Sequence, residues 1–599
     1  MSSFRTVLVR DSTIGDITDD IDYAVKSGAS QATYQQFPTT SASNSALIFN
    51  IQVPSENVII GRDVLINTGL TATLTLTGVP AGQTAWDYGM TDSFQAMPLN
   101  ALFSTATAQI NNTTVSINTQ DVLPALLRMN NSRELYKYNS MTPVLPDQAY
   151  GRYGDAVSGV GSVANPYASS NNNPLADYAQ ASYDLDQVPR GAFPVSYTVV
   201  HTPVSVPAPV DASLVSTGVL DTWTIVVSTV IAEPIVLSPF IFGDPEYNCQ
   251  GFLGINNMTF TFNIDATCKR LFSSANPYIT NVALGSLANP NGFNYQQGAV
   301  GGNIFQTPPA SPQMLFKFLS SQPSDLIATK NIIPYMDFPR YLTSSANASA
   351  VTAGSVATLT SSNVQINQIP DLLIINIRKP MSSQTARDAN AFFKINNISI
   401  NLNNQSGLLS SATAYDLWKM SARNGSTQSW AEFSGQASVG GVQTATTGSL
   451  LILSPAYDLS LPDYISCGSL GSYNLQFTVG VTNQLGETIT PEMVTICANS
   501  GIFTTQQGVS SIYTGILTKE SVLDAKSKQQ SSAVKSAEVK RMVGGSFWNL
   551  GNLGKIAKKA ESAFKIGKEA KDVFDSARGL IGRGTSGGAS SGGAKRFCA

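Results

Sequence analysis

Residue types that could carry out chemistry are scarce in this chain. Its only histidine, His201, lies in the strand-like run 199–202, so neither a multi-histidine metal site nor two histidine-based centres can be built. A Ser–His or Cys–His pair that uses His201 stays open on spacing alone, but no nucleophile-elbow motif accompanies it. The glycines of residues 298–302 lack the lysine and the Ser or Thr of a phosphate-binding loop. We therefore predict no catalytic, cofactor-binding or metal-binding residues, and no enzyme.

The cysteines and the apolar runs indicate the kind of compartment in which the protein is made. An odd number of cysteines without close spacing favours free thiols in a reducing compartment over disulfides: Cys249, Cys268, Cys467, Cys497 and Cys598. Residues 1–30 are too acidic and too interrupted for a signal peptide. No run approaches the roughly 18 apolar residues that a membrane span needs. We expect the chain to be made as a soluble protein.

The elements that must position any functional surface are mainly strands. Only 13% of the residues are charged, and short runs of β-branched residues are separated by turn residues along most of the chain. In residues 70–77, for example, Leu or Ala alternates with Thr at almost every position. A chain of 599 residues is also too long for one ordinary core. The sequence thus predicts an all-β protein with at least two domains.

One stretch of the second half shows three elements in a row. Residues 371–380 are apolar at consecutive positions, which predicts a strand buried on both faces. Residues 397–403 alternate between polar and apolar, which predicts a half-buried strand. Thr413, followed three residues later by Asp416, predicts the N-cap of a short helix that ends near Asn424.

The two halves of the chain share two motif pairs in the same order. Residues 110–112 (Ile-Asn-Asn) match residues 395–397, and a predicted helix follows in both halves. Residues 237–239 (Leu-Ser-Pro) match residues 453–455, and a strand follows each at nearly the same distance. This repetition predicts a duplicated domain. Each copy holds about eight short strands, which suits a sandwich or a jelly roll.

A resemblance to a known family becomes specific in the second half. The run Ile-Pro-Asp-Leu-Leu-Ile-Ile-Asn-Ile-Arg-Lys-Pro at residues 369–380, with residues 398–413, resembles the second-barrel signature of double jelly-roll major capsid proteins. The resemblance is to those of virophages and polinton-like viruses, in the adenovirus-type capsid lineage. The resemblance covers roughly residues 45–524, and in the first half it rests on architecture and on a Leu-Ser-Pro-Phe motif.

The resemblance implies both a fold and an assembly. The fold would be two tandem eight-stranded jelly rolls with short inserted helices. Homotrimers would form pseudo-hexagonal capsomers that tile an icosahedral shell around double-stranded DNA, within a virion assembled inside the host cell. Penton proteins, minor capsid proteins and neighbouring capsomers would be the partners.

On this basis the sequence divides into five segments. They are an N-terminal arm (1–44), a first jelly roll (45–270) with a surface loop (142–191), a linker (271–314), a second jelly roll (315–524), and a C-terminal tether with an amphipathic helix (525–599). The loop is rich in Tyr, Gly, Pro and Asn and is too long for an ordinary connection, so we expect it to carry a surface function.

The C-terminal tail differs electrically from the rest of the chain. From Lys519 onward there are 16 basic and 7 acidic residues, which leaves 20 basic and 32 acidic residues before it. Within residues 550–581 apolar positions recur mainly every three or four residues, with lysines between them, which predicts a basic amphipathic helix. Packing on protein such as the inner capsid wall, binding to a membrane surface and contact with DNA are the three alternatives for this helix.

A short glycine motif joins the tether to this helix. Met542, Val543, Gly544, Gly545 and Ser546 resemble the Met-x-Gly-Gly-x sites cut by adenovirus-type maturation proteases. Two glycines offer a protease an extended segment without side chains. The resemblance implies a viral maturation protease as a partner and cleavage after Gly545, and a flexible linker is the alternative.

A jelly-roll carbohydrate-binding or adhesin protein that uses the 142–191 loop is the alternative function. A secreted lectin would need an export signal and would have little use for a basic helix. A shell protein needs large lateral faces with few charges, because like charges brought together in many copies repel. The low charge and the basic tail therefore favour a capsid protein.

Overall fold

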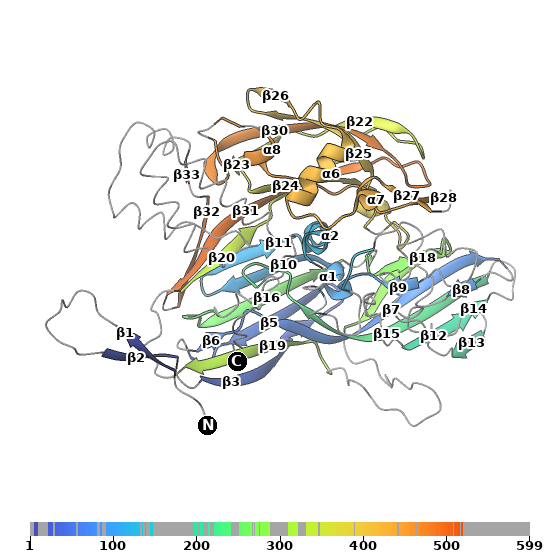
Figure 1. Cartoon of the computed structure of the whole chain (residues 1–599). Coiled ribbons are helices and arrows are strands. Elements are labelled where there is room, and N and C mark those ends of the chain that lie inside the picture. The colour runs from blue at the N-terminus through green and yellow to red at the C-terminus, as the bar shows by residue number, and fades with distance from the viewer. Residues whose placement is uncertain are drawn as a thin grey trace.

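Two β units make up the described part of the chain. The computed structural model describes residues 5–9, 22–27, 30–147, 196–240, 251–287 and 310–518, the longer stretches with short gaps. In Figure 1 the first unit is drawn in blue and green and the second in yellow and orange. Each unit is a sandwich of two sheets, and nearly all strand pairs are antiparallel.

The first unit places its longest strands in one sheet. The order across this sheet is β3 (Ser30–Pro38), β19 (Gln313–Ser321), β7 (Leu65–Val79), β15 (Asp221–Pro234), β12 (Ser196–His201) and β13 (Val204–Pro207), with β6 (Ile59–Ile60) on β19 and β18 (Ile279–Ser286) on β7. The order across the facing sheet is β4 (Ser41–Ala42), β5 (Ala46–Gln52), β16 (Asn257–Ile264), β10 (Phe103–Ile110) and β11 (Thr113–Ile117).

The second unit has two sheets of the same kind. One contains β20 (Asn331–Asp337), β31 (Glu492–Gln506), β24 (Leu372–Arg378) and β29 (Leu451–Leu453), with β21 (Arg340–Thr343) and β32 (Val509–Thr514) on β31. The other contains β22 (Val356–Thr360), β30 (Ser469–Thr482), β25 (Lys394–Leu402) and β26 (Gln405–Leu408), with β23 (Val364–Gln368) and β33 (Leu517–Thr518) on β30. Three small pairs lie outside these larger sheets: β8 (Thr84–Trp86) with β14 (Leu214–Val215), β9 (Asp92–Phe94) with β17 (Phe272–Ser274), and β27 (Gln436–Val439) with β28 (Val442–Ala445).

Strand order identifies both units as jelly rolls. Eight strands correspond between the units: β3, β5, β7, β10, β11, β15, β16 and β19 in the first, and β20, β22, β24, β25, β26, β29, β30 and β31 in the second. In chain order, one sheet of each unit holds the first, eighth, third and sixth of them, and the other holds the second, seventh, fourth and fifth. Eight strands wound in this way into two facing sheets of four form a jelly roll. The predicted tandem jelly rolls are confirmed.

Strand periodicity explains where the cores lie. In β7, Leu70, Ala72, Leu74 and Leu76 are fully buried, as the alternation with Thr predicts. All residues of β24 are buried, because this strand lies between the interior of its own unit and the first unit. In β25 the apolar positions are buried and several polar ones between them are partly exposed. The strands predicted at 371–380 and 397–403 are therefore confirmed.

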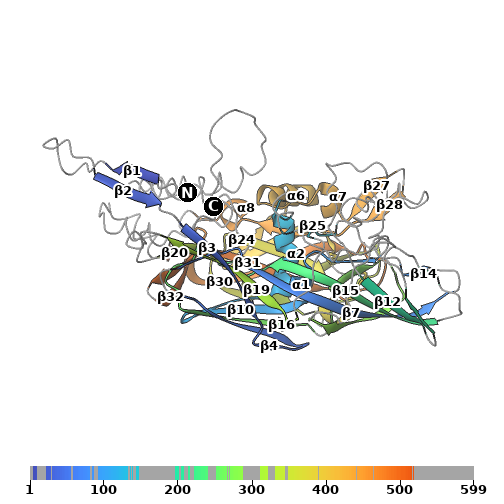
Figure 2. The same cartoon turned by 90° about the horizontal axis from the view of Figure 1, so that it is seen from below.

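The helices occupy connections between strands. They are α1 (Pro98–Leu102), α2 (Thr119–Met129), α6 (Ala414–Arg423), α7 (Trp430–Phe433) and α8 (Pro455–Asp458). The predicted capping box is present at α6: the Thr413 hydroxyl accepts from the amide of Asp416, and the Asp416 carboxylate accepts from the amide of Thr413. Both α2 and α6 follow the fifth strand of their unit, and α6 and α7 lie along one face of the molecule (Figure 2).

The internal repeat is confirmed in order, but its register is corrected. Residues 395–397 lie within β25, whereas Asn111 lies in the turn after β10. The residue equivalent to Asn111 is Asn403, in the turn after β25. Both have a φ of 51°, which Asn tolerates better than most residues. Both bridge to the seventh strand of their unit: the Asn111 side chain accepts from the amide of Asn256 at 2.8 Å, and that of Asn403 accepts from the amide of Asn474 at 2.7 Å.

The expected boundary between the units is also corrected. The sequence placed residues 271–314 in a linker and began the second jelly roll at residue 315. Instead, β18 and β19 pair with β7 of the first unit. β19 is the eighth strand of the first jelly roll and lies between β3 and β7, so the first sheet is incomplete without it.

Several expectations lie wholly or mainly outside the described residues. These are the loop 142–191 beyond Asp147, the tether and amphipathic helix of 525–599, and the processing site Met542, Val543, Gly544, Gly545 and Ser546. The expected N-terminal arm (1–44) is corrected in its second part. There β3 and β4 belong to the two sheets of the first jelly roll, because they pair with β19 and β5. Before them, the described backbone forms β1 (Arg5–Val9) and β2 (Asp22–Ser27), which pair with each other.

Candidate functional site

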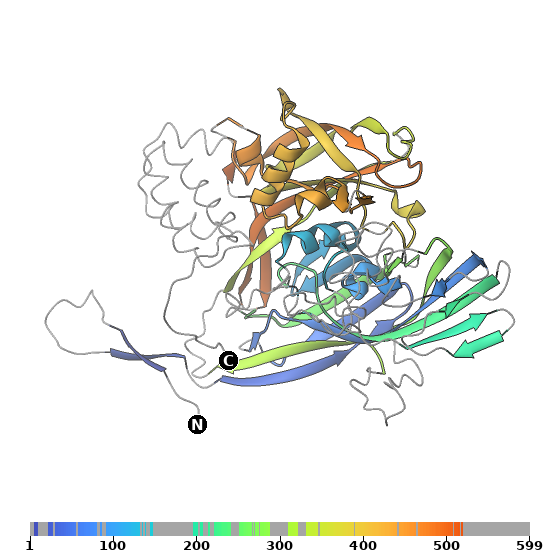
Figure 3. The same ribbon diagram turned by 45° about the vertical axis from the view of Figure 1, so that its right-hand side comes forward.

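The candidate site of this protein is the interface between the two jelly rolls, with helix α2 at its centre. Figure 3 shows α2, a blue coil of the first unit, directly beside the second unit. Every residue of α2 except Gln120 is buried, although the helix is amphipathic in sequence. A helix can be covered on all sides only if a second element packs on its polar face. The second jelly roll is that element.

A buried charge network binds the start of α2 to the second unit. The Asp121 carboxylate accepts a hydrogen bond from the Arg378 guanidinium of β24 at 2.5 Å, and it also pairs with Arg340 of β21. Arg378 in turn donates to Glu492 of β31 at 2.7 Å. The side chains of Asp121 and Arg378 are only 3% and 2% exposed. This network is costly to break, because without Asp121 the buried Arg378 and Arg270 would share Glu492 as their carboxylate in a dry interior.

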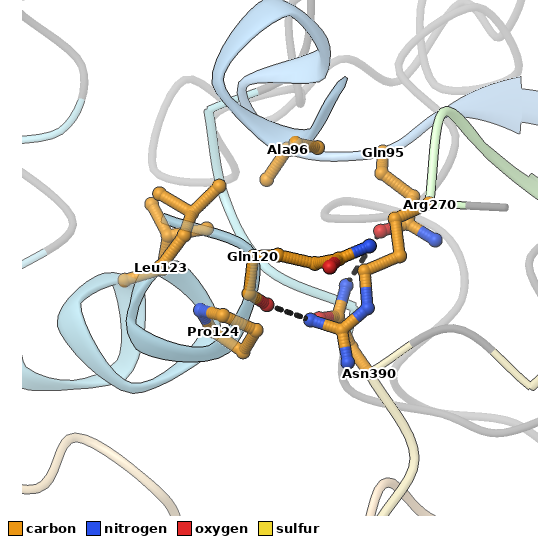
Figure 4. Close-up of a pocket in the computed structure, with 9 residues that line it drawn as sticks. Gln95, Ala96, Gln120, Leu123, Pro124, Arg270 and Asn390 are labelled. Carbon is orange, nitrogen blue, oxygen red and sulfur yellow. Dashed lines mark hydrogen bonds between the residues drawn. The ribbon is translucent and has the colours of Figure 1, made fainter. Parts of the chain in front are cut away.

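A proline inside α2 creates a second connection. Pro124 has no backbone N–H, so the carbonyl of Gln120 lacks its helical partner. The buried Arg270 guanidinium donates to that carbonyl, as Figure 4 shows. Arg270 also donates to the side chain of Gln384 in the second unit at 3.3 Å. Burial, followed by the charge of Arg378, lowers the pKa of Arg270 to about 9.

The end of α2 is bound to the second unit as well. The backbone carbonyl of Arg128, in the last turn, accepts from both the amide and the hydroxyl of Thr427 at 2.7 Å each. Carbonyls in the last turn of a helix have no helical partner, so Thr427 satisfies one of them. The Arg128 guanidinium lies over the ring of Phe392, 5.4 Å from its centroid. Both ends of α2 are thus held by the second jelly roll.

A second contact between the units lies at the turn after β10. Asn111 donates to the hydroxyl of Ser510 on β32 at 3.0 Å, and Asn112 accepts from the amide of Ser510 at 2.7 Å. Thr113 donates to the carbonyl of Ser510 at 2.6 Å. Nearby, Phe252 packs edge to face with Phe503 of β31. Two separate contacts, at α2 and at this turn, fix the orientation of one jelly roll relative to the other.

The contacts at the interface serve to hold the two units together. A small cavity beside α2, lined by Gln95, Gln120, Arg270, Asn390 and apolar neighbours, has room for about one water molecule (Figure 4). Within the described ranges, no three His, Cys, Asp or Glu side chains are grouped so that they could hold a metal ion. No helix in the described part of the chain combines the length and the apolar character needed to cross a membrane.

The described cysteines are free, as expected for these positions. Cys268, Cys467 and Cys497 are buried and unbonded. Burial raises the pKa of Cys268 and of Cys497 to about 12. A thiol with so high a pKa stays protonated and unreactive at neutral pH. These cysteines are core residues.

The interface residues were not identified from the sequence. His201 ends β12, and the proposed processing site lies outside the described residues. Three local signals point to the interface in retrospect: an acid, Asp121, in the first turn of an amphipathic helix, Pro124 in the same helix, and Arg378 at the end of an apolar strand. None of them identifies its partner, because the partners lie far away in the sequence.

Family comparisons cover both jelly rolls. Residues 2–319 match the family described as Sputnik virophage major capsid protein 1st domain. Residues 338–501 match the family described as major capsid protein V20 C-terminal domain. The putative capsid protein V20 of Sputnik virophage is 27% identical over 582 residues, which cover 93% of this chain and 88% of that protein.

Solved structures agree with this fold. The chain in the cryo-EM structure of Sputnik virophage matches with a TM-score of 0.65 and 24% identity, covering 88% of this chain and 97% of that one. The mavirus major capsid protein matches with a TM-score of 0.58 and 14% identity, covering 86% and 95%. At these identities the likeness shows a common fold.

Proposed function

This chain belongs to the family of the Sputnik virophage major capsid protein, and from that membership we propose how it assembles. It is a viral major capsid protein, a structural component of the virion capsid and not an enzyme. We propose that it forms homotrimers in which the six jelly rolls of three chains make a pseudo-hexagonal capsomer. These capsomers would tile an icosahedral shell around double-stranded DNA, with penton and minor capsid proteins as further partners.

The observation that carries this proposal is the repeated strand order in two jelly rolls held in one orientation. A closed ring of three identical chains reuses one interface. Because each chain contributes two similar barrels, a ring of three chains would contain six of them and would have pseudo-sixfold symmetry. The two barrels of a chain must not rotate relative to each other if the capsomer is to keep this symmetry. The buried Asp121–Arg378 pair and the Asn111–Ser510 contact provide that rigidity.

Native mass spectrometry and electron microscopy of the purified full-length chain test the trimer. We expect a principal species of three chains of 63.4 kDa each and pseudo-hexagonal particles in negative stain. A protein that stays monomeric at every concentration tested would contradict the proposal.

The domain boundaries and the tail belong to the same proposal. We place the end of the first jelly roll after β19 and the start of the second before β20, which replaces the boundary expected from sequence. We also propose that a viral maturation protease cuts between Gly545 and Ser546. The last described strand, β33, ends at Thr518, so this cut would leave both jelly rolls intact.

A further inference from the structure

The outer face of the β20–β31–β32 sheet carries exposed apolar residues without a described cover. Ile332 on β20, Val509 at the start of β32 and Tyr513 on β32 are 39%, 59% and 46% exposed. Ile332 pairs with Thr504, which pairs with Ser511, and Tyr513 is two residues beyond Ser511. Ile332 and Tyr513 therefore share one face of the sheet.

The opposite face of this sheet is already occupied. Phe503 and Ile333 are buried in the core cluster that the first unit shares with it, and Ile512 packs against that cluster. Ser510, on the same side, contacts the Asn111 turn. On the outer face the middle strand is already covered, since Ile502 and Thr504 of β31 are each 4% exposed. What remains for another occupant is the exposed part of this face on the flanking strands, defined by Ile332, Val509 and Tyr513.

We propose that the outer face is the docking site for the amphipathic segment 550–581 of the same chain. The first argument is position: β33 pairs with Ser469 and Leu470 at the start of β30. Gly515, two residues after Tyr513, lies against the Leu470 side chain, which is itself 36% exposed. The tail thus leaves the second jelly roll beside the outer face, and Figure 1 shows β31, β32 and β33 along one side of that unit.

The second argument is reach. More than thirty residues separate Thr518 from Leu550. Each extended residue spans about 3.3 Å, so this tether can return to the outer face from any direction. A tethered segment also has a high effective concentration at a nearby site, which favours it over a free partner.

The third argument is chemical complementarity. Asp337 is the only charged residue among β20, β32 and residues 501–506 of β31. An almost uncharged surface offers no attraction to a polyanion such as DNA. It does suit the apolar positions of the tail, which include Leu550, Leu553, Ile556, Phe564, Phe574 and Ile581. The lysines between them would stay in water.

This inference goes beyond the proposed function, because docking does not depend on shell assembly or on cleavage. Its test uses the uncleaved full-length chain with the photo-crosslinking residue p-benzoylphenylalanine in place of Tyr513. The matched control carries the same residue in place of Tyr34, which is also exposed but lies on β3 of the first unit. Mixing isotope-labelled and unlabelled chains distinguishes crosslinks within a chain from crosslinks between chains.

We expect crosslinks from position 513 to residues 546–599 of the same chain, and none to that segment from position 34. Crosslinks from position 513 only to another chain, or none to the tail, would overturn the proposal. Hydrogen exchange gives a second readout. The double variant Ile332→Ser with Tyr513→Ser should speed amide exchange in residues 550–581 at least tenfold, whereas Leu342→Ser, at an equally exposed position on β21, should not change it. Equal exchange in both variants would also contradict docking.

Discussion

At the residue scale, the Asp121 carboxylate decides how firmly the two jelly rolls are joined. It faces a buried arginine, Arg378, and a second one, Arg340, whose side chain is 32% exposed. Removing Asp121 leaves the buried Arg378 and Arg270 with one carboxylate, Glu492, in place of two. Removing the partly exposed Arg340 instead lets water take its place. Loss of the Asp121–Arg378 contact should therefore lower the free energy of unfolding much more than loss of the Asp121–Arg340 contact.

We predict that Asp121→Asn lowers the stability of the full-length chain by about 3 to 5 kcal/mol, the usual cost of breaking a buried ion pair. Arg340→Gln should cost about 1 kcal/mol or less. Urea unfolding followed by circular dichroism measures both. Because Asp121 joins the units, its variant should also broaden the transition or split it in two. Equal losses in the two variants would refute the role assigned to Asp121.

At the element scale, the turns after the fourth strands carry equivalent asparagines. Asn111 and Asn403 share the left-handed backbone and the bridge to the seventh strand. Only Asn111 also contacts the other unit, through Ser510. The repeated turn has thus gained a joining role in one copy.

We predict that Asn403→Ala costs about 2 kcal/mol: about 1 because alanine tolerates the left-handed backbone less well than asparagine does and about 1 for the lost hydrogen bond. Asn403→Gly should cost only about 1 kcal/mol, because glycine tolerates that backbone. Asn111→Ala should cost more than Asn403→Ala, because it loses the Ser510 contact as well. Urea midpoints of the four chains, wild type included, give the order. A larger loss for Asn403→Ala would contradict the joining role of Asn111.

The elements that could be predicted from sequence are those with a local cause. The buried strand β24, the half-buried strand β25 and the capped helix α6 follow from periodicity and from the Thr413–Asp416 pair. The register of the repeat did not follow, because Asn-Asn occurs after an apolar residue both at 396–397 and at 403–404. Only the backbone conformation distinguishes the turn from the strand.

Pairing between distant residues explains the other errors. Because β19 follows a Pro-, Asn- and Gly-rich stretch, the sequence predicts that a new domain starts there. In the structure Gln313 of β19 pairs with Asn67 of β7, so the strand belongs to the first jelly roll. Likewise, nothing near Asp121 in the sequence indicates Arg378. Composition reports what a segment can form locally, whereas the partner of an edge strand or of a buried charge is set by the whole fold.

At the scale of the whole molecule, the chain is a rigid double barrel followed by a long basic tail. The jelly rolls are fixed to each other by buried contacts on α2 and by partly buried contacts at the Asn111 turn, so a capsomer built from them would need no rearrangement within each chain. The tail begins after β33, beyond the last described strand. A cut in the tail can therefore change the properties of the chain without changing its fold.

We predict that the chain isolated from purified virus particles ends at Gly545. A protease of the proposed kind binds an extended, side-chain-free segment, and Gly544 and Gly545 supply one. Intact-mass spectrometry of the particles measures the end point. The variant Gly545→Val should leave the full-length chain in particles, because a β-branched side chain fills the space that the protease needs. Gly551→Val, outside the motif, should be cut as in the wild type. Particles of the natural virus in which every chain extends beyond Gly545 would show that Met542 to Ser546 is a linker. The tail would then be a permanent part of the shell.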